Sequence, residues 1–110
     1  MERKITILVY PATDTEKAKA FFNAYLGVKP YVDSPYYIGY RTGDFEVGID
    51  PNSNIGPIAY TDVTDIRASL KEMTDAGATI IKDITDVAQG LLVAQVKDAQ
   101  GNVVGFRQQP

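Results

Sequence analysis

The feature that most constrains the fold of this chain is a pattern that occurs twice, about fifty residues apart. An apolar, β-branched run at 5–10 precedes a helix pattern that ends at Gly27, and a similar run at 58–63 precedes one that ends at Gly77. Glycine is common directly after a helix because it adopts positive φ without strain. Further strand-like runs follow each helix pattern, so each half is predicted to be a βαβββ module of an α+β fold.

Both helix patterns carry a capping signal and an apolar stripe. Thr13 is predicted to cap the first helix, with Glu16 reaching back to it as in a capping box. Thr64 or Asp65 is predicted to cap the second helix. The apolar residues at helical spacing are Ala18, Phe21, Phe22, Tyr25 and Leu26 in the first helix and Ile66, Leu70 and Met73 in the second. We expect both stripes, Tyr25 included, to pack in the core.

Short runs rich in β-branched and aromatic residues predict the strands. Besides the two runs above, they lie at 36–41, 45–49, 78–81, 91–96 and 102–107. The segment rich in Pro, Asn and Gly near the midpoint is predicted to be a linker. The single domain 1–110 then consists of module one (1–50), the linker (51–57) and module two (58–110). The polar, glycine-ended segment 83–90 is predicted to be a loop, which either covers a pocket or simply connects two strands.

One helix can shield only one face of a four-stranded sheet. The second face of each module must therefore be covered by the other module or by another chain. Two such sheets side by side would form a curved mixed sheet around a cavity, where a ligand would bind. Whether the two modules of one chain pair together or with those of a partner chain is left open by the sequence.

Composition argues against several classes of partner and cofactor. The chain has a net charge of −3 and no basic run longer than Arg3-Lys4, so neither nucleic acid nor a membrane surface is an expected partner. The apolar N-terminal run is too short for a signal peptide or a membrane span, and a cytoplasmic location is expected. Because the chain has no His and no Cys, imidazole and thiolate ligands are absent, and no cofactor is expected. Whether the chain is an enzyme stays open.

Several segments, in order along the whole chain, resemble those of one known superfamily. The segment DTEKAKAFF at 14–22, closed by Leu26-Gly27, is similar to the start and end of its first helix. Val63 to Ile66, Ala76 to Ala78 and DAQGNVVGF at 98–106 are similar to its second half and its closing turn and strand. The chain thus resembles the vicinal oxygen chelate superfamily, which includes glyoxalase I, bleomycin-resistance proteins and extradiol dioxygenases. The resemblance implies a fold of paired βαβββ modules.

The metal enzymes of that superfamily commonly hold their ion with two His and two Glu on inner strand faces. The resemblance assigns these four positions to Ile7, Gly48, Ile58 and Gly105. None of these side chains has a donor atom for a divalent ion, so the chain is interpreted as a member that lacks the metal ligands. An atypical set of oxygen ligands, drawn from Glu46, Asp50 and Asp62, is the alternative.

Strand alternation, counted from these four positions, selects side chains on the same sheet faces. Together with strand tyrosines and one amide in an apolar strand, they give the candidate ligand-binding residues Tyr37, Tyr40, Glu46, Tyr60, Asp62, Gln95 and Arg107. The tyrosines would stack on a flat ligand, or they are simply aromatic residues that favour strands and interfaces. Asp62 and Arg107 would bind a polar ligand group, or they form a structural salt bridge.

The sequence therefore predicts a metal-independent small-molecule binding protein, similar to the bleomycin-resistance branch of the superfamily. The expected partners are a small aromatic or amphipathic molecule and a second copy of the chain in a homodimer. Two alternatives remain. One is an atypical metal-dependent lyase, isomerase or dioxygenase, and the other is a non-catalytic module with a vestigial pocket.

Overall fold

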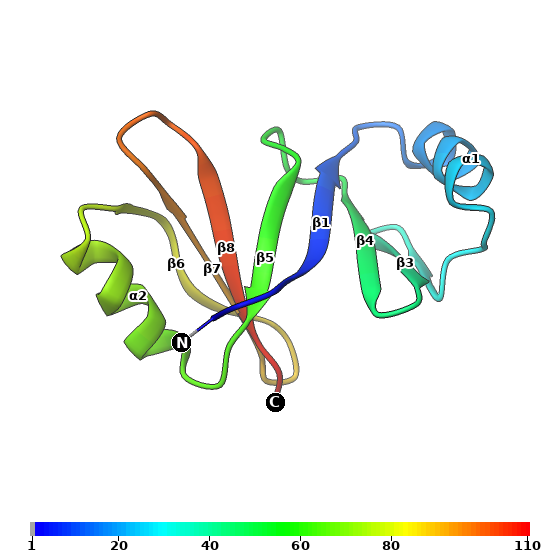
Figure 1. Ribbon diagram of the computed structural model, residues 1–110. Helices are drawn as coiled ribbons and strands as arrows, with labels where there is room; N and C mark the ends of the chain where they lie inside the picture. Colours follow the sequence, from blue (N-terminus) through cyan, green and yellow to red (C-terminus); the bar gives the residue numbers. More distant parts are fainter. Residues whose placement is uncertain (1) are drawn as a thin grey trace. The chain divides into compact units, whose positions relative to one another are not determined.

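The computed structural model describes residues 2–110 and contains the βαβββ order twice. The first set is β1 (Ile5–Pro11), α1 (Thr15–Leu26), β2 (Val32–Ser34), β3 (Tyr37–Thr42) and β4 (Phe45–Asp50). The second set is β5 (Ile58–Asp62), α2 (Ile66–Asp75), β6 (Thr79–Ala88), β7 (Leu91–Lys97) and β8 (Val103–Gln108). The predicted α+β class and the two βαβββ modules are confirmed (Figure 1).

The chain divides into two compact units, which we describe separately. The first unit is Thr6–Ile58, and the second is Ala59–Pro110 together with the N-terminal segment that ends at Ile5. That segment joins the second unit through Arg3, whose guanidinium donates to Glu72 of α2 at 3.1 and 3.2 Å and lies 5.8 Å from the centroid of the Phe106 ring. Among the described residues, no helix is long and apolar enough to cross a membrane.

In the first unit, the strands follow the order β2-β3-β4-β1. The β2, β3 and β4 strands are antiparallel neighbours, and β4 runs parallel to β1. One face of this sheet is covered by α1. The buried residues on that face are Ile38, Tyr40, Val47 and Ile49, and Ala18, Phe22 and Leu26 of α1 pack against them.

In the second unit, the order is β5-β8-β7-β6, with β5 parallel to β8 and the other neighbours antiparallel. Figure 1 shows α2 beside this sheet. The core between them contains Ile66 and Leu70 from the helix and Ala94, Val96 and Phe106 from the strands. Each unit thus has one helix-covered face and one helix-free face, as expected for one helix and four strands.

Aspartates cap both helices. Asp14 accepts a hydrogen bond from the Lys17 amide at 3.0 Å, so the prediction of Thr13 as the first cap is wrong. Asp65 accepts from the Ala68 amide at 3.1 Å, which decides between the two predicted caps of α2. A carboxylate has the further advantage of a negative charge at the positive end of the helix dipole. Gly27 and Gly77 have φ of 71° and 103°, as predicted for helix ends.

The apolar stripe of α1 is narrower than the sequence predicts. Phe22 packs in the core, but Phe21 is 63% exposed and Tyr25 is 75% exposed. Their rings stack on each other, with centroids 6.2 Å apart and 13° between planes. The prediction that Tyr25 lies in the core is therefore wrong. The sheet contacts only the row of α1 that contains Phe22, in which residues are spaced by four positions. The adjacent row, which contains Phe21 and Tyr25, points away from the sheet.

The predicted cover loop at 83–90 is also wrong, because β6 continues through Asp83 to Ala88 and pairs with β7. Only Gln89 and Gly90 form the turn, with φ of 48° and 95°. The β6 strand is exposed along nearly its whole length at one edge of the second sheet, where polar side chains are common. The polar sequence of this exposed strand is therefore similar to that of a loop, which explains the wrong prediction.

Candidate functional site

The helix-free face of the second sheet carries four of the predicted site residues. Side chains registered opposite one another on neighbouring strands point to the same face. Tyr60 of β5 is registered with Gly105 of β8, which in turn is registered with Gln95 of β7. One step along the strands, Asp62 of β5 is registered with Arg107 of β8. The prediction that these four side chains share one sheet face is thus confirmed.

The Tyr60 ring lies directly over Gly105. A Cβ atom at position 105 would overlap this ring, so the close contact requires glycine there. The Gln95 amide nitrogen donates to the Tyr60 hydroxyl at 2.8 Å, which gives the strand amide the partner that a half-buried polar group needs. In this unit, the position of a superfamily metal ligand is therefore covered by the chain's own tyrosine.

Asp62 and Arg107 form a bidentate ion pair. The Arg107 Nε donates to Asp62 Oδ1 at 2.6 Å, and Nη2 donates to Oδ2 at 3.1 Å. The Arg107 side chain is only 10% exposed, whereas that of Asp62 is 36% exposed. The guanidinium is thus held inside by its partner, because an uncompensated buried charge is strongly unfavourable. The carboxylate keeps an edge toward solvent and can accept further hydrogen bonds.

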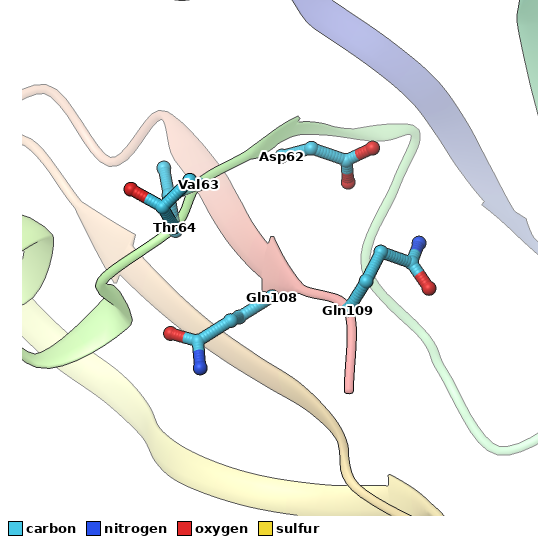
Figure 2. Close-up of a pocket in the computed structure, with 5 residues that line it drawn as sticks. All are labelled: Asp62, Val63, Thr64, Gln108 and Gln109. Atoms are coloured by element: carbon cyan, nitrogen blue, oxygen red, sulfur yellow. The ribbon is translucent and has the colours of Figure 1, made fainter.

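An open pocket of about 360 Å³ adjoins this ion pair, and its lining residues are Asp62, Val63, Thr64, Gln108 and Gln109. Figure 2 shows the Asp62 carboxylate and the Gln109 amide extending to the same side, and Gln108 extending the other way. The Gln108 side-chain oxygen accepts from the Ile66 amide at 2.7 Å, which stabilises the start of α2. The volume falls in the range of small-molecule sites.

Thr64, Gln108 and Gln109 were not predicted as site residues. They follow or close the carboxyl ends of β5 and β8, which are parallel neighbours. Ligands of α/β folds commonly bind at the carboxyl ends of parallel strands. The parallel pairing of β5 with β8, which would have pointed to them, was not predicted from the sequence.

The helix-free face of the first sheet holds a second group of side chains. The Tyr37 hydroxyl lies where a Cβ at Gly48 would be, and the Tyr37 ring also approaches Gly39. Tyr31 donates its hydroxyl to the Glu46 carboxylate, and the Arg41 guanidinium lies 4.2 Å from the centroid of the Tyr31 ring. Tyr37 and Glu46 were predicted as site residues.

Tyr31 and Arg41 were not predicted as site residues. Arg41 is registered with Glu46 across β3 and β4, so alternation could have found it. Tyr31 lies just outside β2 and had no such signal.

Tyr40 is the predicted site residue that lies elsewhere. It is fully buried on the helix-covered face of the first sheet, and its hydroxyl donates to the Asn23 side-chain oxygen at 2.6 Å. Burial raises the pKa of Tyr40, and the nearby Asp33 carboxylate adds to the effect. Tyr40 is three residues from Tyr37, so the two side chains point to opposite faces of β3. Its assignment to the ligand site is corrected to a role in the core.

The superfamily's metal does not fit the residues at its four assigned positions. Ile7 and Ile58 are 3% and 2% exposed, and Gly48 and Gly105 lie under tyrosine rings. None of these residues supplies an oxygen or nitrogen side-chain donor. Across residues 2–110, no three His, Cys, Asp or Glu side chains gather closely enough to hold an ion.

Comparisons with known proteins agree with the fold. A protein of unassigned function from Bacillus halodurans C-125 is 18% identical over 100% of this chain and 96% of its own, with a TM-score of 0.78. A glyoxalase/bleomycin resistance protein/dioxygenase superfamily member from Vibrio splendidus 12B01 is 14% identical over 98% of this chain and 100% of its own, with a TM-score of 0.72. Methylmalonyl-CoA epimerase from Streptomyces coelicolor is 11% identical over 96% of this chain and 94% of its own, with a TM-score of 0.69. These identities support a shared fold only.

No curated protein matches the chain significantly. The model of the Glyoxalase/Bleomycin resistance protein/Dioxygenase superfamily, however, matches residues 4–106, which is nearly the whole sequence. The chain belongs to the glyoxalase/bleomycin resistance protein/dioxygenase superfamily.

Proposed function

We propose that this protein binds a small aromatic or amphipathic molecule without a metal ion, in the open pocket at the carboxyl ends of β5 and β8 in the second unit. The observation that carries the proposal is the Asp62–Arg107 pair beside an open pocket. Its guanidinium is buried, but its carboxylate is 36% exposed. The exposed edge supports a ligand-binding role, because it leaves acceptor lone pairs of the carboxylate facing a pocket of ligand size.

The lining favours a ligand whose polar group donates hydrogen bonds. The Asp62 carboxylate is an acceptor only, and the Thr64 hydroxyl and Gln109 amide can donate or accept. The net charge of −3 further favours a neutral or cationic group over an anionic one. Val63 provides an apolar contact for the rest of the molecule. An aromatic amine is the simplest compound with these properties.

Binding without turnover is the part of the proposal that separates it from an enzyme. The chain has no His or Cys, so neither an imidazole base nor a thiolate nucleophile is available. The Tyr60 hydroxyl, on a neighbouring position of β5, accepts a hydrogen bond from the Gln95 amide. We extend the proposal to a cytoplasmic homodimer, as expected from the sequence.

A second candidate is a non-catalytic module with a vestigial pocket. It is favoured by Tyr37 and Tyr60, whose rings cover Gly48 and Gly105 at two of the superfamily's metal positions. Under this alternative, the chain acts through its outer surfaces and holds no small molecule.

Thermal-shift and calorimetric titrations after EDTA dialysis distinguish the candidates. The probes are a panel of planar aromatic amines, the matching aromatic carboxylates, and uncharged amphiphiles. We expect amines to raise the melting temperature without added metal. Gln109→Ala and Asp62→Asn should weaken this binding at least tenfold, whereas Asp75→Asn, an exposed carboxylate on α2, should not.

Two results would count against the proposal. A panel that gives no shift at millimolar concentration supports the vestigial pocket. A shift that needs added Zn²⁺ or Mn²⁺ contradicts metal independence. Gln109 is exposed and outside the core clusters, so its variant tests the site even if Asp62→Asn is unstable.

A further inference from the structure

The turn between β6 and β7 contacts Pro110, the residue that follows Gln109 of the pocket. Leu92 of β7 is registered with Gln108 of β8, so the same antiparallel register, continued by two residues, places Gly90 opposite Pro110. A Cβ atom at position 90 would lie 3.0 Å from the Pro110 Cβ, which is too close for an ordinary contact. The bare Cα of Gly90 therefore provides a seat for Pro110. Figure 1 shows the end of the chain beside this turn.

The carboxylate of Asp86 fixes the shape of the turn. The register shift between Asp86 and Ala88 leaves Val87 as the extra residue of a β-bulge, which interrupts the regular hydrogen bonding of β6. Asp86 accepts hydrogen bonds from the Ala88 amide at 3.1 Å and from the Gly90 amide at 3.0 and 3.1 Å. Gln89 and Gly90 have φ of 48° and 95°, the positive values that two-residue hairpin turns favour. One carboxylate thus holds the amides on both sides of Gln89.

Pro110 in turn restricts Gln109, which lies beyond the last residue of β8, Gln108. A proline disfavours the helical conformation of the residue before it and favours an extended one. An extended Gln109 continues the alternation of β8, so its side chain lies on the same face as Arg107. Figure 2 shows this arrangement, with the Gln109 amide on the side of the Asp62 carboxylate and Gln108 extending the other way.

We propose that the β6–β7 turn positions Gln109 for ligand binding, and that Asp86 is the positioning residue. Asp86 is not among the residues that line the pocket, so it acts through the turn and Pro110. This inference rests on the proposed function, because Gln109 is taken there as a ligand contact. A side chain that is held in place before binding loses less conformational entropy when a ligand binds. Loss of Asp86 therefore weakens binding without removing a ligand contact.

NMR relaxation of the ligand-free protein tests whether the turn holds Gln109. The heteronuclear NOE of the Gln109 backbone and side-chain amides should be lower in Asp86→Ala and in Pro110→Ala than in the wild type. Gly90→Ala should have the same effect, because the added methyl group displaces Pro110. Asp86→Asn should restore most of the wild-type value, since one carboxylate oxygen accepts from both turn amides and the Asn side chain keeps one such oxygen.

Two variants are matched controls for this comparison. Asp83→Ala removes another exposed carboxylate of β6, one that accepts from the Ile84 amide at 2.8 Å. Gly101→Ala places a methyl group at a glycine with φ of 88°, but nothing lies within 4 Å of a Cβ there. Both controls should leave the Gln109 values unchanged. Equal values for Gln109 in the wild type, Asp86→Ala and Pro110→Ala would overturn the inference.

Calorimetry tests the consequence for binding, with a planar aromatic amine such as tryptamine, chosen from the panel by its thermal shift. Asp86→Ala should raise the Kd roughly three- to tenfold, the range expected when one side chain must be ordered on binding. In a Gln109→Ala background, Asp86→Ala should have no further effect. An equal loss of affinity in both backgrounds would show that the turn does not act through Gln109.

The experiments separate failure of this inference from failure of the proposed function. A panel in which no compound binds the wild type refutes the proposed function, and the NMR comparison still decides whether the turn holds Gln109. Binding to the wild type with an equal Kd for Asp86→Ala supports the pocket and overturns the role of the turn.

Discussion

Asp62 and Arg107 face each other across the parallel strands β5 and β8, joined by hydrogen bonds of 2.6 and 3.1 Å. The pair is unequal, because the guanidinium is nearly buried and the carboxylate is partly in solvent. This inequality leads to different expectations for the two partners. Removing the carboxylate deprives a buried charge of its bidentate partner, whereas removing the guanidinium leaves a carboxylate that water can solvate.

Asp62→Ala should therefore lower the free energy of unfolding more than Arg107→Met. We expect losses of about 3 kcal/mol for the first and about 1 kcal/mol for the second. Urea denaturation at neutral pH measures both, and the Asp62→Ala/Arg107→Met double variant should recover most of the larger loss. A greater loss for Arg107→Met would show that the packing of its aliphatic stem, and not its charge, dominates.

Gly105→Ala should destabilise the protein by about 1–3 kcal/mol, because the added methyl group overlaps the Tyr60 ring. The same substitution in a Tyr60→Ala background should be nearly neutral, which a double-mutant cycle by denaturation measures. Equal effects in both backgrounds would mean that the backbone at Gly105, and not the ring above it, requires glycine.

Tyr40→Phe should lower stability by about 1–2 kcal/mol, because it removes the hydroxyl that donates to Asn23 and leaves a half-buried amide without that donor. Burial raises the pKa of Tyr40 above the ordinary value of 10.0. A raised pKa in the folded state means that the stability from Tyr40 is present below that ordinary pKa. It is lost as the pH rises through the folded value.

The pH dependence of unfolding measured between neutral pH and pH 11 checks the Tyr40 prediction. The wild type should lose more stability than Tyr40→Phe over the alkaline part of this range. Tyr36→Phe, at an exposed tyrosine, is the control and should follow the wild type. Parallel curves for the wild type and Tyr40→Phe would contradict the effect of burial.

Asp14→Ala should cost about 1 kcal/mol of stability, since the carboxylate caps α1 by accepting from the Lys17 amide. Thr13→Ala should cost only a few tenths of that, because Thr13 precedes the cap. Thermal unfolding monitored by circular dichroism compares the two. A larger effect at Thr13 would restore the capping box that the sequence predicts.

Much of the site was predictable from alternation alone. Tyr60, Asp62, Gln95 and Arg107 share a face because side chains on a strand alternate, and this rule needs no knowledge of the rest of the chain. Alternation could also have separated Tyr40 from Tyr37, since the two are three positions apart on one strand and an odd spacing puts them on opposite faces. The position of the Tyr60 and Tyr37 rings over Gly105 and Gly48 was not predictable, because it depends on rotamers chosen in the packed sheet.

The sequence by itself determined the two βαβββ modules, the helix ends at Gly27 and Gly77, and the lack of donor atoms at the metal positions. These features depend on local periodicity, on backbone conformation at single residues and on residue chemistry. The tertiary structure alone decided which apolar row of α1 meets its sheet, and that polar β6 is a strand and not a loop. Both depend on pairing and packing with segments far away in the chain, where the energy of the contact outweighs local preference.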